Sequence, residues 1–210
     1  MIECQDVSFS YPASTLPDSE RQAGGALKHI SCTIEDGSFV LLCGTSGCGK
    51  TTMTRLFNGL IPHYHEGTYT GSVYLDGKDT RDLSLFDISL KVGSVFQNPR
   101  SQFFNVDTTS ELAFGPENHG IAEDLVRDRV KRVAAQLKLE PLLDRSIFSL
   151  SGGEKQKIAC GSAAAIDPDI YVLDEPSSNL DAYAIADFRQ LLFTLKSQGK
   201  IGRASCRERV

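Results

Sequence analysis

The chain of 210 residues contains no run of roughly 18 apolar residues, so the sequence predicts no membrane-spanning helix. Its first residues, Met1 to Asp6, include neither a basic nor an apolar segment and do not resemble a secretory signal peptide. The net charge is −5 with no long basic block, which disfavours a dedicated nucleic-acid binder. We therefore expect a cytoplasmic protein that reaches a membrane only through a partner and binds no nucleic acid.

The sequence also contains no C-x-x-C pair, which disfavours a zinc site and a disulfide framework. Its six cysteines are scattered: Cys4, Cys32, Cys43, Cys48, Cys160 and Cys206. We expect them to be reduced and mostly to be small core residues, with Cys48 as an exposed exception. The length suits one α/β domain, or one domain with an insertion.

A glycine-rich segment, Gly44-Thr45-Ser46-Gly47-Cys48-Gly49-Lys50-Thr51-Thr52, matches the P-loop pattern G-x-x-x-x-G-K-[ST]. The apolar run Phe39–Cys43 before it predicts a buried strand, and apolar residues at helical spacing follow it. Backbone N–H groups on such a turn can point at phosphate oxygens. We expect Lys50 to reach the β- and γ-phosphates of a nucleotide and Thr51 to offer its hydroxyl to Mg²⁺.

Apolar periodicity and turn residues predict the other elements. Strands are expected at 2–10 (an edge strand), 27–34, 71–75, 92–96 and 170–173, and loops at 13–26 and 62–71. A short helix or a loop is expected at 83–90, and helices at 109–113, 122–139, 153–165 and after Asp181. Leu125 is placed on the apolar face of the helix at 122–139. The mostly helical stretch from about 98 to 165 indicates an insertion in an α/β core.

Three polar groups are candidates for chemistry near the P-loop. The strand at 170–173 ends in Asp174, which can hold Mg²⁺ through water, and Glu175, which can polarise the attacking water. Adjacent acids after a strand are common by chance, so the P-loop carries this interpretation. Gln97 also follows a predicted strand and can offer its amide oxygen to Mg²⁺ and to the attacking water.

A second anion-binding helix start is predicted at Leu150-Ser151-Gly152-Gly153-Glu154, from the Ser151 hydroxyl and the glycine N–H groups. A second phosphate cradle is surplus on one chain unless it serves the nucleotide of a partner chain.

The ordered set of GTSGCGKTT, Gln97, LSGGE, YVLDEP and Ser178-Asn179-Leu180-Asp181 resembles the ATPase subunits of ABC transporters over about residues 1 to 200. The resemblance implies an α/β fold: a P-loop NTPase core with an antiparallel β subdomain and an inserted α-helical subdomain. It also implies ATP and Mg²⁺ as cofactors, ATPase activity, and a head-to-tail dimer with a second ATPase subunit that sandwiches two ATPs.

The same resemblance implies a role for each matched residue. Tyr11 would stack on adenine, although a lone Tyr is more often a packing residue. Gly44 to Thr52 would be Walker A, and Gln97 would couple the Mg²⁺ site to the membrane partner. Asp174 would be the Walker B acid and Glu175 the catalytic base. Ser151, Gly152 and Gly153 would contact the γ-phosphate held by the opposite subunit, and Asp181 would end the D-loop, which crosses to that site.

Three segments resemble the energy-coupling-factor (ECF) class more narrowly: Asn58–His63, Val95–Phe104 and Glu111–Gly115. This class energises uptake of vitamins or transition-metal ions through a transmembrane coupling protein and a substrate-binding membrane protein. The segment Asn98–Phe104 would line the groove for a coupling helix. The alternative is an exposed loop with two unpaired phenylalanines, Phe103 and Phe104, which a partner contact explains better.

The last ten residues, 201–210, depart from the family pattern. They contain no run that predicts a buried strand, and they resemble a translated sequencing adapter, with a natural basic tail as the alternative. The family's switch histidine is expected near 206–209, yet the four histidines are His29, His63, His65 and His119. We therefore expect one open sheet edge and weak ATP binding and hydrolysis by this chain.

Two readings compete with a transporter subunit. One is a soluble ABC ATPase that acts on ribosomes or DNA, which usually has two ATPase halves or a long coiled coil. The other is a nucleotide-binding fragment that does not hydrolyse ATP. Glu175 argues against the second reading, and the missing histidine argues for it.

Overall fold

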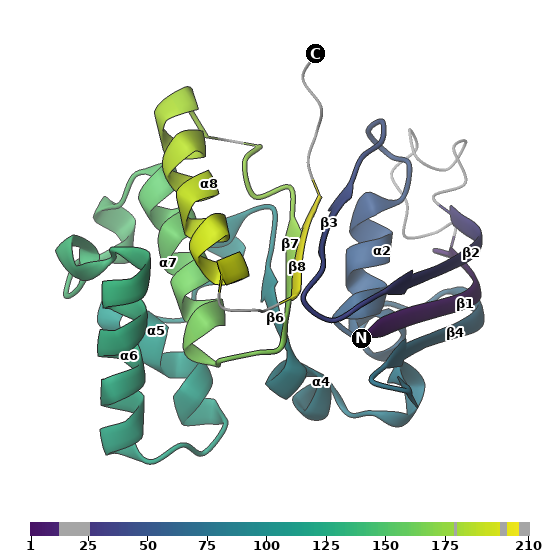
Figure 1. Cartoon of the computed structure of the whole chain (residues 1–210), viewed down its shortest axis with the longest axis horizontal. Helices are drawn as coiled ribbons and strands as arrows, with labels where there is room; N and C mark the ends of the chain where they lie inside the picture. The colour runs from purple at the N-terminus through teal and green to yellow at the C-terminus, as the bar shows by residue number, and fades with distance from the viewer. Residues whose placement is uncertain (13–25, 179, 198–200, 206–210) are drawn as a thin grey trace.

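The computed structural model describes residues 1–12, 26–178, 180–197 and 201–205, which form two four-stranded sheets with helices between and beside them (Figure 1). One sheet is antiparallel, with strand order β2-β1-β4-β5, and the other is parallel, with order β3-β8-β7-β6. This is the α/β fold with an antiparallel part and a helical part that the sequence predicts.

The antiparallel sheet comprises β1 (Ile2–Ser10), β2 (Ala26–Ile34), β4 (Thr68–Leu75) and β5 (Lys78–Asp79). The prediction that β1 is an edge strand is wrong, because it pairs with β2 on one side and β4 on the other. Alternating residues show that one face of a strand is buried but cannot show how many neighbours it pairs with. The β4–β5 turn confirms the Asp76-Gly77 signal, with both residues at positive φ.

A bulge in β1 meets a glycine in β4. The β1–β4 register shifts between Gln5 and Ser8, where Asp6 has φ 48°. Gly71 faces it with φ 77°, and a Cβ there would lie 2.3 Å from the Asp6 carbonyl oxygen. Only glycine therefore fits at position 71 without moving the backbone.

The parallel sheet comprises β3 (Phe39–Leu42), β6 (Val92–Val95), β7 (Ile170–Asp174) and β8 (Ile201–Ser205). The prediction that no strand forms after residue 200 is wrong for 201–205, because β8 pairs in parallel with both β3 and β7. A parallel ladder uses backbone N–H and C=O groups, which all five residues possess. A strand that is not rich in Val and Ile can therefore complete the sheet between β3 and β7, where an open edge was expected.

Strand β3 is less buried than its apolar sequence predicts. Phe39 is 39% exposed and Leu41 is 51% exposed, because β3 is the outermost strand of its sheet. The ammonium of Lys196, from α8 (Ala182–Ser197), lies 5.7 Å from the Phe39 ring centroid. In contrast, all five residues of β7 are buried, as predicted for the strand that ends in the two acids.

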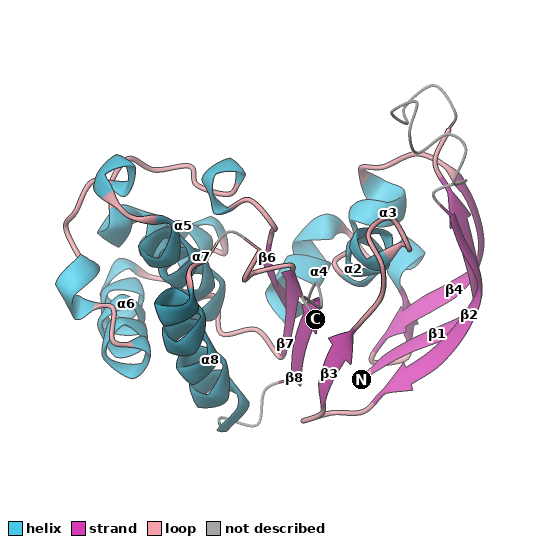
Figure 2. Cartoon of the chain, turned by 90° about the horizontal axis from the view of Figure 1, so that it is seen from above, coloured by secondary structure: helices cyan, strands magenta, loops and turns pink. Residues whose placement is uncertain are grey.

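Two groups of helices flank the parallel sheet (Figure 2). The short helices α2 (Lys50–Phe57), α3 (Leu60–His63) and α4 (Leu85–Lys91) lie between the two sheets. The longer helices α5 (Thr108–Asn118), α6 (Glu123–Leu137), α7 (Gly152–Ala165) and α8 lie on the other side. This second group contains the predicted helical stretch. Each group has its own cluster of buried apolar residues.

The apolar face of α6 is shifted by one residue from the prediction. Leu125 is 55% exposed, whereas Val126 is 3% exposed and packs with Val130, Val133 and Leu137. The spacings between these residues, four, three and four, are those of one helical face. Leu125 lies five residues before Val130, a spacing that places it off this face. Among the described helices, none is long and apolar enough to cross a membrane.

Candidate nucleotide-binding site

The glycine-rich loop connects β3 to α2, as predicted. Gly49 is the N-cap residue of α2, with φ 96° and no side chain to bond the first N–H groups of the helix. Gly47 also has positive φ, at 79°. These backbone conformations leave amide groups at a helix N-terminus available to an anion. The local geometry is that of a phosphate-binding turn.

The ammonium of Lys50 lies inside this turn. Its Nζ donates hydrogen bonds to the carbonyl oxygens of Gly44 at 3.0 Å and Thr45 at 2.9 Å. It also lies 3.8 Å from Oε1 of Glu175, and both side chains are less than a tenth exposed. A buried ammonium so close to the helix N-terminus adds positive charge where the amides converge.

Cys48 is exposed, as predicted, and its Sγ lies 4.0 Å from Lys50 Nζ. The general prediction for the cysteines is only partly right. Cys4 and Cys160 are buried, whereas Cys32 is half-buried and Cys43 is exposed. Cys43 directly follows the outermost strand, which explains its exposure. Cys206 lies outside the described residues.

The two acids at the end of β7 face the P-loop from the neighbouring part of the sheet. The Thr51 hydroxyl donates a hydrogen bond to Asp174 Oδ1 at 3.2 Å. Burial raises the pKa of Asp174, and the charge of Glu175 raises it further. A hydroxyl, a buried carboxylate and the nearby amide of Gln97 form an oxygen donor set that fits Mg²⁺. A cation there would offset the charge that burial destabilises.

Gln97 contacts Glu175 directly. Its Nε2 donates a hydrogen bond to Glu175 Oε2 at 3.0 Å. Glu175 has φ 43°, a conformation that non-glycine residues rarely adopt. Such backbone strain often accompanies functional positions. The structure therefore brings together the two residues predicted to be catalytic.

The segment that follows Gln97 is braced at two points. Gln102 accepts a hydrogen bond from the Phe96 N–H at 3.1 Å and donates one to the Ser94 carbonyl at 3.2 Å. The buried Glu111 accepts from the N–H groups of Phe104 at 3.0 Å and Asn105 at 2.9 Å. The loop is thus held from both β6 and α5.

The alternative interpretation of this segment, an exposed loop with two unpaired phenylalanines, differs from the structure in two respects. Phe103 is half-buried and packs against the helical core. Phe104 is 75% exposed, but its ring stacks on Phe114, with centroids 4.7 Å apart. The apolar surface on this segment is therefore the outer face of a stacked aromatic pair.

A pocket of about 280 Å³ opens over the phosphate-binding turn. It is lined by Tyr11, Ser46, Gly47, Gly49, Lys50, Thr51, Thr52, Arg55, Gln97 and Glu175. Tyr11 is far from the loop in sequence, and the fold brings it into this lining. Its contact with adenine stays a prediction. Asp174 lines an adjoining pocket of about 270 Å³ together with Thr51 and Gln97.

Arg55 was missed by the sequence analysis, although it lines both pockets. It lies four residues after Thr51 on α2, so helical spacing places it on the same face. That periodicity was the available signal. Asn58, which also lines the adjoining pocket, follows the same helical spacing, seven residues after Thr51 at the end of α2. Ser94 had no comparable signal, because its position depends on the pairing of β6 with β7.

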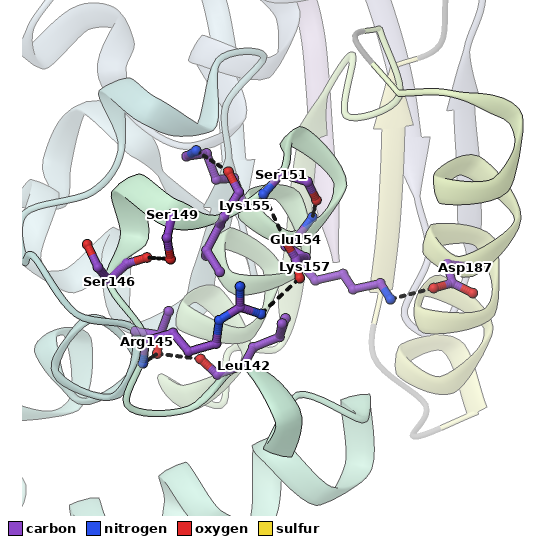
Figure 3. A network of polar contacts seen from close by, with 11 residues as sticks. Leu142, Arg145, Ser146, Ser149, Ser151, Glu154, Lys155, Lys157 and Asp187 are labelled. Carbon is purple, nitrogen blue, oxygen red and sulfur yellow. Dashed lines mark hydrogen bonds and ion pairs between the residues drawn. The ribbon is translucent and has the colours of Figure 1, made fainter.

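Ser151, Gly152, Gly153 and Asp181 do not line the nucleotide pocket among the described residues. Ser151 caps α7: its hydroxyl accepts from the Glu154 N–H at 3.2 Å, and Glu154 Oε2 accepts from the Ser151 N–H at 2.7 Å (Figure 3). A hydroxyl that accepts one hydrogen bond can still donate its own proton. Asp181 caps α8 by accepting from the Ala184 N–H at 2.8 Å.

The helix that begins at Ser151 is tied to its surroundings. Arg145 Nη1 donates to Glu154 Oε1 at 3.1 Å, and Lys157 pairs with Asp187 of α8 (Figure 3). A Cβ on Gly153 would lie 2.9 Å from the Cβ of Ala184, so the start of α7 packs closely on α8. The starts of α7 and α8 are thus held against each other.

All four histidines lie in the described part of the chain, and none of them lines the nucleotide pocket.

Comparison with known proteins identifies the family. The family model described as ABC transporter matches residues 27–178. An ABC transporter ATP-binding protein of Treponema denticola is 48% identical over 95% of this chain, which spans 39% of that relative. One from Pyrococcus horikoshii is 42% identical over 96% of this chain, which spans 68% of that relative. The chain thus spans about two fifths of the first relative's length.

Solved structures show the same fold. The structure of cbiO1 from Clostridium perfringens, titled as part of the ABC transporter complex cbiONQ, has a TM-score of 0.81 and 25% identity. The match covers 99% of this chain and 78% of that one. The ATP-binding cassette MJ0796, as a dimer bound to ADP and Pi, has a TM-score of 0.79 and 25% identity, covering 98% of this chain and 88% of that one.

The phosphate-binding turn, the buried acids at the end of β7 and the family match agree with one another. The chain belongs to the ABC transporter family and is an ATP-binding ABC ATPase domain, a member of an ATP-hydrolysing enzyme family.

Proposed function

We propose that this domain binds and hydrolyses ATP as the energising subunit of an ECF-type ABC importer for vitamins or transition-metal ions. Its partners are a second ABC ATPase subunit, a transmembrane coupling protein and a substrate-binding membrane protein. The domain works as a peripheral protein at the cytoplasmic face of the cell membrane. The similarity to cbiO1, part of the complex cbiONQ, supports this class.

The nucleotide binds across the 280 Å³ pocket. Gly44 to Thr52 surround the phosphates, with Lys50 exchanging its bonds to the loop carbonyls for phosphate oxygens. Tyr11 contacts the adenine at the far side of the same pocket. Thr51, Asp174 and Gln97 would hold Mg²⁺, which would neutralise charge on the phosphates.

Glu175 is the general base in this proposal. It lies at the end of a buried strand, next to the ammonium of Lys50, and accepts a proton from the attacking water. The Gln97 amide fixes the orientation of the carboxylate through their hydrogen bond at 3.0 Å. The oxygen of the same amide would then be available to the water and to a bound metal ion.

Ser151, Gly152, Gly153 and Asp181 act in the site of a second subunit. Their position outside this chain's own pocket supports that role. The dimeric MJ0796 cassette provides a precedent for such an assembly. Arg145 reduces the negative charge of Glu154 at the helix start where a phosphate would approach.

The observation that carries the transport proposal is the path from Glu175 to an exposed aromatic surface. Gln97 bonds Glu175, and seven residues later the braced segment presents Phe104, 75% exposed and stacked on Phe114. A large exposed aromatic on a rigid loop fits contact with an apolar partner helix. Movement of that partner would displace the segment from Gln97 to Phe104 and so change the contact of Gln97 with the Glu175 carboxylate.

Reconstitution in lipid vesicles with the coupling and substrate-binding proteins tests this function. The transport reading predicts ATP hydrolysis that rises on assembly and substrate uptake that needs ATP. Phe104→Asp should abolish assembly while leaving ATP affinity unchanged, because an ionised carboxylate cannot enter an apolar contact. Leu125→Asp, which places the same charge at an exposed apolar site on α6, should assemble normally.

Other outcomes would favour the competing readings. Copurification with ribosomes or DNA, together with normal assembly of Phe104→Asp, would support a soluble ABC ATPase. ATP binding without hydrolysis in the assembled complex would support a hydrolysis-defective domain.

A further inference from the structure

A cation in the nucleotide pocket pairs with an aromatic side chain. Arg55 lies on α2, one turn after Thr51, and its Nη1 donates a hydrogen bond to the Tyr11 hydroxyl at 2.8 Å. The guanidinium carbon lies 5.8 Å from the centroid of the same ring. Both side chains line the pocket. The helix that starts at the phosphate-binding turn is thus bonded directly to the expected adenine contact.

Two other rings contact Tyr11 by their edges or faces. Phe9, from the core of the antiparallel sheet, lies 4.9 Å away at an interplanar angle of 88°. His65 lies 6.0 Å away at 87°. Perpendicular ring contacts of this kind are individually weak. They confine the Tyr11 ring, but its hydroxyl end is fixed by Arg55.

We propose that Arg55 is a positioning residue for nucleotide binding: its bond to the Tyr11 hydroxyl holds the ring in the orientation on which a purine stacks. This inference rests on the proposed adenine contact of Tyr11. A ring that is ordered before binding loses less side-chain freedom when the base arrives, which strengthens affinity. Arg55 suits this task because α2 is anchored by the buried Met53, Leu56 and Phe57.

A different role for Arg55 is also physically reasonable. Its charge acts to lower the pKa of Asp174, so it could act on the metal or the phosphates instead. The two roles differ in the ligand that reports them. Positioning of Tyr11 affects only ligands with a base, whereas an effect on the metal site or phosphates also changes the binding of inorganic tripolyphosphate.

Calorimetric titration of the purified chain with MgATP and with magnesium tripolyphosphate separates these roles. Arg55→Met should weaken MgATP binding roughly five- to tenfold and change tripolyphosphate binding by less than about twofold. Tyr11→Phe, which keeps the ring but removes the acceptor, should weaken MgATP to a similar degree. The double variant should bind no more weakly than either single variant, because both break the same bond.

Arg127→Met is the matched control. Arg127 lies on α6, where it pairs with Glu123 at 2.8 Å, so its removal deletes the same charge far from the pocket. It should change neither affinity. Thermal melts monitor folding, and Tyr11→Phe preserves the aromatic packing if Arg55→Met proves unstable.

Equal weakening of both ligands by Arg55→Met would overturn the inference, as would losses that multiply in the double variant. Unchanged MgATP binding by Arg55→Met, with a clear loss for Tyr11→Ala, would overturn the role of Arg55 alone. Unchanged MgATP binding by Tyr11→Ala would overturn the adenine contact and this inference with it. None of these results depends on whether the domain energises an importer.

Discussion

Gln97 donates a hydrogen bond to Glu175 at 3.0 Å although 78 residues separate them in sequence. The sheet register explains this contact, because Val95 pairs with Leu173 and each polar residue follows two positions later. Parallel strands end at the same edge of the sheet, so their next residues meet there. The proposed base and its amide partner are therefore positioned by backbone pairing rather than by flexible loops.

Replacing Glu175 with Gln should reduce kcat by at least about 100-fold, because the amide cannot accept the proton of the attacking water. MgATP affinity should change by less than about threefold, since the side chain keeps its shape and an acceptor oxygen for Gln97. Steady-state hydrolysis and calorimetry measure the two quantities. A variant that keeps a tenth of the wild-type kcat would show that another group acts as the base.

Gln97→Glu should shift the pH dependence of hydrolysis. Two carboxyl groups about 3 Å apart cannot both ionise readily, so the pKa of the pair is raised. The base is then active only at higher pH, and the acidic limb of the kcat profile moves upward by about one pH unit or more. Gln97→Ala removes the amide without adding charge and should therefore move the limb less than Gln97→Glu does. An unmoved limb in Gln97→Glu would mean that Glu175 does not titrate as the base.

Asp174→Asn should stabilise the nucleotide-free domain at pH 7. The folded-state pKa of Asp174 is raised, so the folded protein binds its proton more tightly than the unfolded chain does. Stability from this group is gained as the pH falls through the folded pKa and lost as the pH rises. The melting temperature should increase by roughly 2 °C at pH 7, because solvent screens part of the charge.

The difference between Asp174→Asn and the wild type should shrink as the pH falls below the raised folded-state pKa of Asp174, because the wild-type carboxyl then takes up its proton. The same variant should weaken the Mg²⁺ dependence of ATP binding. A variant that melts below the wild type at pH 7 would contradict the proposed cost of burying this carboxylate.

Gly71→Ala should lower the free energy of unfolding by about 2 to 4 kcal/mol, from backbone strain and a collision with a backbone carbonyl. The Cβ would lie 2.3 Å from the Asp6 oxygen. Gly77→Ala is a matched control, with nearly the same φ of 76° but nothing within 4 Å of the added Cβ. It should cost only about 1 kcal/mol. Urea titration of both variants isolates the collision, and equal losses would show that strain alone decides.

Local patterns were sufficient to predict the phosphate-binding turn and the buried acids. The glycines and Lys50 of the P-loop pattern are sufficient to predict the turn. The apolar run before Asp174 is sufficient to predict a buried strand that ends in the two acids. Patterns of this kind do not reveal which strands are neighbours. The inner position of β1, the exposed face of β3 and the insertion of β8 all depend on pairing between distant segments. Arg55 differs from these cases, because its spacing of four residues from Thr51 already predicts the same helical face and the sequence analysis did not use it.

The central prediction is that Ser151 completes a nucleotide site on a second copy of this domain. ATP hydrolysis by a one-to-one mixture of Lys50→Ala and Ser151→Arg variants tests it most directly. Each variant alone should be nearly inactive, because every site then contains one defect. In the mixture, half of the dimers contain one intact site, so about a quarter of the wild-type activity should return. A mixture that stays as inactive as its components, or a Ser151→Arg variant that is fully active alone, would contradict a shared site.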